Sequence, residues 1–496
     1  MGENRTEDDL TEMVLKPGNH GMVVVHGVAD TVTKGDLLAS VTNSLADVLL
    51  DSPVMRPDGA SERPVIRREA DLSAETPSVT LSIETPDGKE ASWVCKEAFW
   101  AEAFPPPSAP SVFKWLLGQQ MVAQLRYVWK GLKDDPANNE DFHPPTPGKT
   151  EPHWRSRGLV NFIYRLELAA LGILLLPLSV IVPLLLVLIW PLYWLPRFGF
   201  LAGFLNLLHS LDPFLSRVLG DIKRYIEHGV WAANARGILE DIVIGMLEGR
   251  HGEMEDVTIV AHSLGAVVAY DALAEGGRIA DLVAGSAAGQ AKRITLVTVG
   301  SGINQVFKLV RGSNLYARTQ FDRPLAAAIT GGPQATAGME DLSESRFYWL
   351  DIYARFDPVP AGDLDDDIIS RAQVDPRLVK RRRVINFDNP VRDHTHYWQN
   401  RELVMPRIAR AVNGGEYPWP AARITQERVR RRIRGVATLG LLRLLIALVV
   451  IASLVVAGLQ LVDTIPGGPM AVPEAVAVIA IGIYQLIRSR KFGDIT

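Results

Sequence analysis

Residues 257–273 read VTIVAHSLGAVVAYDAL, and this stretch decides the fold. Its first four residues are an apolar, β-branched run, which predicts a buried strand. The small and apolar residues that follow Ser263 predict a helix, so Ser263 lies on a sharp strand-to-helix turn. Small residues are needed two positions before and two positions after such a serine, because the turn brings backbones close together. Ala261 and Gly265 occupy these positions, Ala261 standing where a glycine is usual.

Ser263 on this turn can be interpreted either as a nucleophile or as a residue that only caps the helix. A serine hydroxyl becomes a strong nucleophile only when a neighbouring base removes its proton. The turn presents Ser263 to such a base, and the backbone amide of Leu264, at the start of the helix, is placed to bind an oxyanion. The alternative is an ordinary strand, turn and helix in which Ser263 only caps the helix.

Further strands surround this one in the sequence. Alternation of strands with helices predicts a mostly parallel sheet flanked by helices, an α/β fold. Two shorter runs, separated by the turn residues Pro86-Asp87-Gly88, predict a hairpin. The basic run 380–383 is expected as a solvated loop before the last strand. The predicted strands are 22–25, 79–83, 91–94, 257–260, 294–299, 349–353 and 384–387.

Candidates for an acid and a base follow the later strands. Asp357 comes shortly after strand 349–353, where its carboxylate would orient an imidazole. A turn-capping role for Asp357 is the alternative, and the acidic loop residues Asp363, Asp365, Asp366 and Asp367 are rival acids. His394 and His396 follow the last predicted strand. Spacing alone leaves both histidines open as the base.

The stretch around Ser263, with its Ala-His-Ser-Leu-Gly pentapeptide, resembles the nucleophile region of α/β-hydrolases, in particular lipase-like serine esterases. The resemblance extends in scattered blocks over residues 20–50, 90–115 and 215–405. It implies an α/β-hydrolase fold and a serine esterase activity that needs no cofactor. The sequence departs from the family at Ala261 and in an apolar insert that soluble esterases lack.

The resemblance also implies roles for individual residues. Residues 23–27 resemble the strand and His-Gly turn that supply the second oxyanion donor, which would be the amide of Val28. His26 and Gly27 would then support the turn. The Asp-Pro-Val-Pro element at 357–360 resembles the one that supplies the acid. The element from 393 to 398 resembles Asp-His-x-x-Tyr-Trp, which places the base on His394 and leaves His396 as its rival.

Composition limits the other classes of function. The net charge is −4, which gives no reason to expect nucleic acid as a partner. Cys95 is the single cysteine, so an internal disulfide is excluded. No metal site is expected, because the histidines lack partners at ligand spacing.

Three segments predict membrane attachment. Residues 166–195 contain one charge, Glu167, and are broken by several prolines. Residues 444–462 and 472–487 read as a helical hairpin with basic residues at both outer ends, which puts both ends in the cytosol. Strands 22–25 and 257–260 must be neighbours, so the chain between them crosses the membrane an even number of times, including zero. The insert is then a re-entrant hairpin or an embedded patch, and a buried cap over the sheet is the alternative.

The expected protein is therefore a membrane-anchored serine hydrolase on the cytoplasmic side that cleaves esters, with lipid acyl esters as substrates. A thioesterase or acyltransferase on the same triad, and a non-catalytic membrane scaffold, are the alternatives. The sequence leaves open whether membrane helices pair two copies into a homo-oligomer. The expected division is a disordered leader (1–19), the two parts of the hydrolase domain (20–158 and 220–412), the apolar insert (159–219), a basic linker (413–435) and the transmembrane hairpin (436–496).

Overall fold

A computed structural model of the chain describes the α/β part of the molecule. All described residues belong to one of two compact units, which comprises residues 1–123, 139–147 and 197–424. The described residues are 15–27, 33–51, 54–55, 61–100, 220–285, 292–311, 319–339, 345–354, 357, 359–360, 362–384, 386, 390–401 and 403–414.

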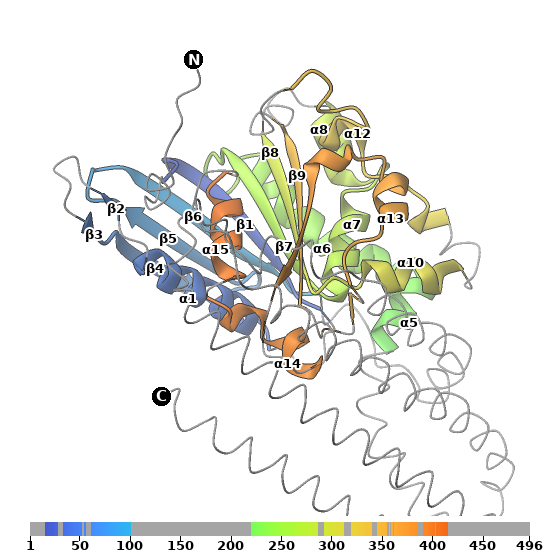
Figure 1. Cartoon of the computed structure of the whole chain (residues 1–496), viewed down its shortest axis with the longest axis horizontal. Helices are drawn as coiled ribbons and strands as arrows, with labels where there is room; N and C mark the ends of the chain where they lie inside the picture. The colour runs from blue at the N-terminus through green and yellow to red at the C-terminus, as the bar shows by residue number, and fades with distance from the viewer. Residues whose placement is uncertain are drawn as a thin grey trace, which may run out of the picture. The chain divides into compact units, whose positions relative to one another are not determined.

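An eight-stranded sheet forms the centre of this unit, in the order β10-β9-β8-β7-β1-β6-β5-β4 (Figure 1). Parallel pairing runs from β10 to β6, and β6, β5 and β4 pair antiparallel. The strands are β1 (Gly18–Val25), β4 (Val65–Asp71), β5 (Ser78–Glu84), β6 (Glu90–Ala98), β7 (Asp256–His262), β8 (Arg293–Val299), β9 (Phe347–Ala354) and β10 (Val379–Val384), with a separate pair β2 (Val54–Met55) and β3 (Ser61–Glu62).

Helices cover both faces of the sheet (Figure 1). On one face α1 packs on β5 and β6, and α15 packs on β7 and β8. On the other face α6 and α7 pack on β1 and β7. The helices are α1 (Asp36–Leu50), α5 (Gly220–Glu227), α6 (Gly229–Leu247), α7 (Leu264–Ala272), α8 (Arg278–Gly285), α10 (Ile303–Arg311), α12 (Ala327–Thr330), α13 (Asp366–Arg371), α14 (Pro390–Thr395) and α15 (Met405–Val412), with 3-10 turns η9 (Pro376–Leu378) and η10 (Tyr397–Gln399).

The two hydrophobic cores follow from the alternation of side chains along the central strands. Val23 and Val25 of β1 point to the face of α6 and α7, whereas Met22 and Val24 point to the face of α1 and α15. Both faces are covered, so the central strands are apolar nearly throughout, as is usual for parallel sheets. The expected α/β class, with a mostly parallel sheet between helices, is confirmed.

The expected neighbours β1 and β7 do pair, in parallel, from His20–Asp256 to Val25–Ala261. The chain leaves β1 through α1 on one face and enters β7 from α6 on the opposite face. In open α/β sheets, a crevice forms beyond the carboxyl ends of strands where the connections diverge in this way. Gly27, just after β1, and Ser263, just after β7, both lie at this end.

The structure differs from expectation at the basic run 380–383. The run lies within β10, which pairs with β9, and the expectation of a loop there was wrong. The last strand was predicted at 384–387 but begins earlier, at Val379, because the charged residues 380–383 show no alternation of apolar side chains. β10 is an edge strand, so its side chains need not be apolar on both faces, and charges on an edge discourage pairing with other chains. The opposite edge strand, β4, is charged in the same way.

The folded part also begins earlier than the expected leader boundary. Leu15 is buried, the backbone N–H of Lys16 donates to Asn413 Oδ1 at 3.0 Å, and Gly18 opens β1. Residues 15–19 therefore belong to the folded part.

Among the residues that the structure describes, no helix is both long enough and apolar enough to cross a membrane. The apolar insert at 159–219 and the hairpin at 436–496 lie outside the described residues.

Candidate active site

Ser263 joins β7 to α7 through an unusual backbone conformation. Its φ is 54° and its ψ is −121°, and Gln373 is the other non-glycine residue with positive φ in the described part of the chain. Such a conformation costs about 1–3 kcal/mol and persists only where the surroundings hold it. Here the Ser263 N–H donates to Val299 O at 3.1 Å, and its carbonyl accepts from the N–H of Gly302 at 3.0 Å. The turn is therefore fixed to the end of β8.

Small residues let the turn fit between β1 and α7. A Cβ on Gly27 would lie 2.7 Å from the Cβ of Ser263, and a Cβ on Gly265 would collide with the carbonyl oxygen of His26. Ala261 is fully buried in the core beneath α7. The sequence pattern around Ser263 thus reflects the close approach of two strands and a helix.

His394 lies between Ser263 and Asp357. Its Nε2 is 3.0 Å from the Oγ of Ser263, and its Nδ1 is 3.0 Å from Oδ2 of Asp357. A carboxylate only accepts hydrogen bonds, so the ring proton belongs on Nδ1, and Nε2 accepts from the serine hydroxyl. The three candidates that the sequence placed far apart are joined in one chain of hydrogen bonds.

Asp357 is fully buried and held by several donors. Its Oδ1 accepts from the N–H of Val359 at 2.9 Å, and its Oδ2 accepts from the Tyr397 hydroxyl at 2.7 Å. A buried carboxylate is costly unless it is hydrogen-bonded in this way. Asp357 can therefore stay in place behind His394.

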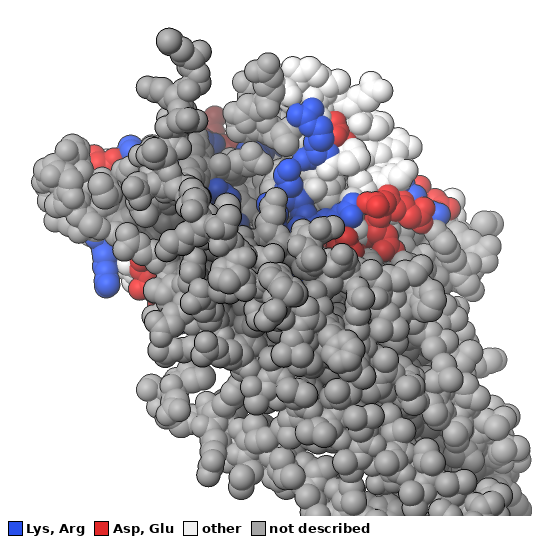
Figure 2. All heavy atoms as spheres, in the orientation of Figure 1, with Lys and Arg blue, Asp and Glu red and all other residues white. Residues whose placement is uncertain are grey.

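The rival residues lie elsewhere. His394 is the histidine that contacts Ser263 Oγ, whereas Nδ1 of His396 lies 2.6 Å from the Thr395 hydroxyl. Asp363 and Asp366 form ion pairs with Arg381, and Asp367 pairs with Arg371 at 3.3 Å. On the visible face of the described part, Figure 2 shows Asp and Glu side chains next to Lys and Arg side chains.

Of the two expected oxyanion donors, the structure describes one. Leu264 is the first residue of α7, where backbone N–H groups have no acceptor within the helix. Val28 lies outside the described residues. The turn that leads to it, at His26 and Gly27, is described.

His26 ties this turn to the end of β6. Its Nε2 accepts from the N–H of Trp100 at 3.0 Å, the Trp100 indole donates back to His26 O at 2.9 Å, and the two rings stack at 4.8 Å. The ring proton must then sit on Nδ1, which donates to Gly27 O at 2.9 Å. Burial lowers the pKa of His26 to about 4, so the ring stays neutral. These contacts are those of a turn-supporting residue.

Sequence reasoning assigned no role to two residues at the site, His262 and Gly300, and it expected Tyr397 only to pack below the loop of His394. His262 packs against His394 from β7, Tyr397 donates to Asp357, and Gly300 lies against Tyr397 and Asp357. A Cβ on Gly300 would lie 2.7 Å from Cε2 of Tyr397 and 2.8 Å from Oδ2 of Asp357. The signals were present: His262 precedes Ser263, and Gly300 ends a predicted strand. Their roles depend on contacts between distant segments.

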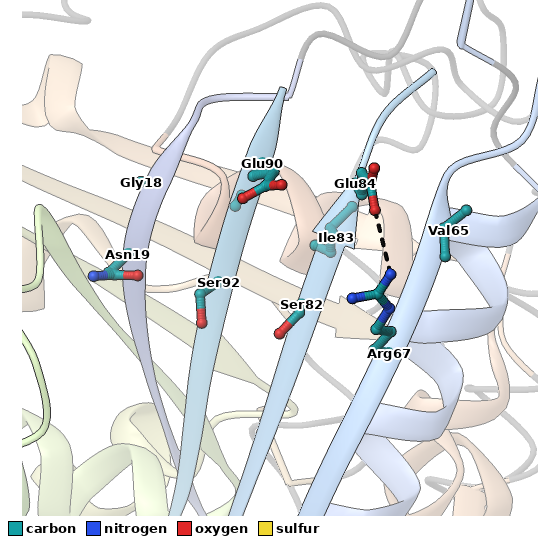
Figure 3. A pocket seen from close by; sticks show the side chains of 10 residues that line it. Gly18, Asn19, Val65, Arg67, Ser82, Ile83, Glu84, Glu90 and Ser92 are labelled. Carbon is teal, nitrogen blue, oxygen red and sulfur yellow. Dashed lines mark ion pairs between the residues drawn. The ribbon is translucent and has the colours of Figure 1, made fainter. Parts of the chain in front are cut away.

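A hollow in the surface lies away from this site. It is at the edge of the sheet where β1, β6 and β4 begin, and Figure 3 shows polar side chains such as Asn19, Ser82 and Ser92 around it. Its ion pair, Arg67–Glu84 at 3.7 Å, is largely exposed and contributes little to stability.

Among the described residues, no group of three or more His, Cys, Asp or Glu side chains is placed to hold a metal ion. The chemistry available at Ser263 is thus a hydroxyl, a base that accepts its proton, a buried carboxylate and a helix amide. This set can perform acyl transfer through a covalent intermediate. Comparison with known proteins adds no assignment: no family model matches the chain, and neither does any curated protein or solved structure.

Proposed function

We propose that this protein is a membrane-attached serine hydrolase of the α/β-hydrolase type that cleaves carboxylic esters. The observation that carries the proposal is the hydrogen-bonded line from Ser263 Oγ through His394 to Asp357 Oδ2, with both contacts at 3.0 Å. The strained turn after a central parallel strand supports it, because such a turn presents the hydroxyl at the carboxyl end of the sheet.

In the first half-reaction the Oγ of Ser263 attacks the ester carbonyl carbon, while its proton moves to Nε2 of His394. Asp357 stabilises the imidazolium that forms. The carbonyl oxygen becomes an oxyanion, which the amide of Leu264 binds together with the expected amide of Val28. The carbon–oxygen ester bond then breaks, and the leaving alcohol takes the proton from His394.

In the second half-reaction water replaces the alcohol. His394 accepts a proton from the water as its oxygen attacks the acyl-enzyme carbonyl. Collapse of the second tetrahedral intermediate releases the acid, and His394 returns the proton to Ser263 Oγ. No cofactor is required for either half.

Lipid acyl esters are the proposed substrates, and the cytoplasmic side of a membrane is the proposed location. The apolar segment 166–195, with a single charge, and the segments 444–462 and 472–487 support this. They would hold the site near the bilayer, so that an ester of low water solubility reaches Ser263 from the membrane. Membrane helices also offer surfaces on which two copies could pair.

The test compares substrates and variants of the full chain in mixed micelles. We expect hydrolysis of long-chain glycerolipid esters to exceed that of short soluble esters. We expect His394→Ala to lower kcat by orders of magnitude and His396→Ala, the matched control, to leave it within about threefold. A preference for short esters would overturn the lipid assignment. Equal losses in the two histidine variants would overturn the role of His394.

The same experiment separates the alternatives. Faster turnover of acyl thioesters, or transfer to an added alcohol in place of water, would point to a thioesterase or acyltransferase on the same residues. Complete absence of turnover on every ester would favour a membrane scaffold that retains the fold without catalysis.

A further inference from the structure

His262 precedes the candidate nucleophile, and its ring lies against the candidate base. The imidazole centroids of His262 and His394 are 4.7 Å apart, with the planes tilted by 31°. The rings of Tyr397 and Trp398 lie at 6.0 Å and 5.7 Å in edge-on orientation. His262 thus fills the space between β7 and the segment that carries His394.

A hydrogen bond joins the same two residues. Nε2 of His262 lies 2.8 Å from the carbonyl oxygen of His394. A carbonyl oxygen only accepts, so the ring must carry its proton on Nε2 and donate it. The contact is to the backbone of His394, so it restrains where this residue lies relative to Ser263 and Asp357.

The surroundings keep His262 neutral. Burial among aromatic rings, together with the nearby His394 and His26, lowers the pKa of His262 to about 3. His262 therefore remains neutral while His394 gains and loses a proton. Because His262 stays neutral, it places no second positive charge beside the imidazolium of His394.

The restraints on the segment around His394 act at different atoms, and one of them is a hydrogen bond from the Asn386 side-chain amide to the carbonyl of Asp393 at 3.1 Å. His394 lies near the end of the short helix α14, which follows β10. Asp357 contacts the ring of His394 from one side and Ser263 from the other, but both act on the side chain. The donor from His262 acts on the main chain. Position matters here, because a displacement of about 1 Å at reacting groups can cost 100-fold in rate.

We propose that His262 is a positioning residue for the base. By donating a hydrogen bond to the carbonyl of His394 and packing against its ring, it fixes the distance of that ring from Ser263 and Asp357. This inference rests on the proposed hydrolase function. It predicts that the N–H donor matters more than the imidazole ring itself.

Two variants separate these contributions. His262→Phe keeps a flat ring but loses the donor, and His262→Gln keeps an N–H donor near the position of Nε2 but loses the ring. We expect His262→Phe to lower kcat by about 10- to 100-fold with KM unchanged within twofold. We expect His262→Gln to keep kcat within about fivefold of the wild type.

The pH profile provides a readout that a purely structural role would not move. A looser contact between His394 and Asp357 holds the imidazolium less firmly. The acidic limb of kcat/KM should therefore move to lower pH in His262→Phe and stay in place in His262→Gln. An unchanged limb with kcat equally reduced in both variants would show that His262 serves only to pack the core, and would overturn the inference.

A spectroscopic measurement distinguishes this failure from failure of the proposed function. With imidazole ¹⁵N labelling of the full chain in detergent, the Nδ1 proton of His394 that faces Asp357 should give a strongly downfield ¹H signal. We expect the signal to be lost or shifted in His262→Phe and retained in His262→Gln, whether or not any ester turns over. An inactive wild type would overturn the hydrolase function alone, whereas an unaltered signal in His262→Phe would overturn the role of His262.

Discussion

The hydroxyl of Tyr397 donates a hydrogen bond to Oδ2 of Asp357 at 2.7 Å, the same oxygen that faces Nδ1 of His394. The hydroxyl also accepts from the backbone N–H of Ala354 at 2.7 Å. Tyr397 and Asp357 are both fully buried. Burial beside the Asp357 carboxylate raises the pKa of the Tyr397 hydroxyl well above its usual value. Tyr397 therefore links the end of β9 to the acid and the base.

The Tyr397→Phe substitution tests this link. It leaves the N–H of Ala354 without its acceptor and removes one donor from Asp357, so the free energy of unfolding should fall by about 1–3 kcal/mol. We expect kcat/KM to fall by about tenfold as Asp357 becomes less firmly held. Tyr270→Phe is the matched control, because Tyr270 is also buried but donates to Arg323 O, away from the site. Comparable losses of kcat/KM in both variants would argue against a specific role for Tyr397.

Gly300 should tolerate no side chain. Its φ is 55°, and a Cβ would press on both Tyr397 and Asp357. We expect Gly300→Ala to reduce ester hydrolysis at least 100-fold and to lower the unfolding midpoint. Gly237→Ala is the control: nothing lies within 4 Å of its added Cβ, and alanine favours a helix interior by about 0.5–1 kcal/mol. An active, stable Gly300→Ala protein would be inconsistent with this packing.

Buried His26 predicts sensitivity to acid. Its pKa is lowered from 6.5 to about 4 by burial, so the unfolded chain binds a proton in this interval that the folded chain does not. The stabilisation is present above pH 6.5 and is lost as the pH falls toward 4, at up to about 1.4 kcal/mol per pH unit. His26→Gln should be less stable at pH 7 but show a shallower decline, measured by urea unfolding in detergent. An equally steep decline in both proteins would contradict the assignment.

Glu97 predicts the opposite dependence. Burial raises its pKa from 4.5 to about 7, while its Oε2 accepts from the N–H of Gly35 at 2.7 Å. Its contribution to stability is fully present below pH 4.5 and is lost as the pH rises through 7. Glu97→Gln keeps an acceptor without ionising, so above pH 7 it should be more stable than the wild type by at most about 3 kcal/mol. No difference between the two proteins at pH 8 would contradict this account.

Sequence patterns predicted the central strands well, because strands buried on both faces are uniformly apolar. β1, β7, β8 and β9 follow such runs. β4 was missed, and the last strand was predicted at 384–387 instead of at β10, because the charged side chains of edge strands leave no hydrophobic period. Apolar patterns therefore predict the strands at the centre of the sheet but not those at its edges.

The site was predictable to the extent that local geometry determines it. Ser263 and Gly265 were predicted from a turn whose demands appear in adjacent residues. The pairing of His394 with Asp357 was expected only through a resemblance, and spacing alone did not decide between His394 and His396. The contacts of His262 and Tyr397 join segments over a hundred and some forty residues apart in the chain, so no local pattern carries them.

The most direct test of the central claim is intact-mass measurement after exposure of the full chain to a fluorophosphonate probe. The account predicts one adduct per chain, located on the peptide that contains Ser263, and none in Ser263→Ala. A wild-type chain that forms no adduct, or a Ser263→Ala chain that is labelled as fully as the wild type, would contradict it.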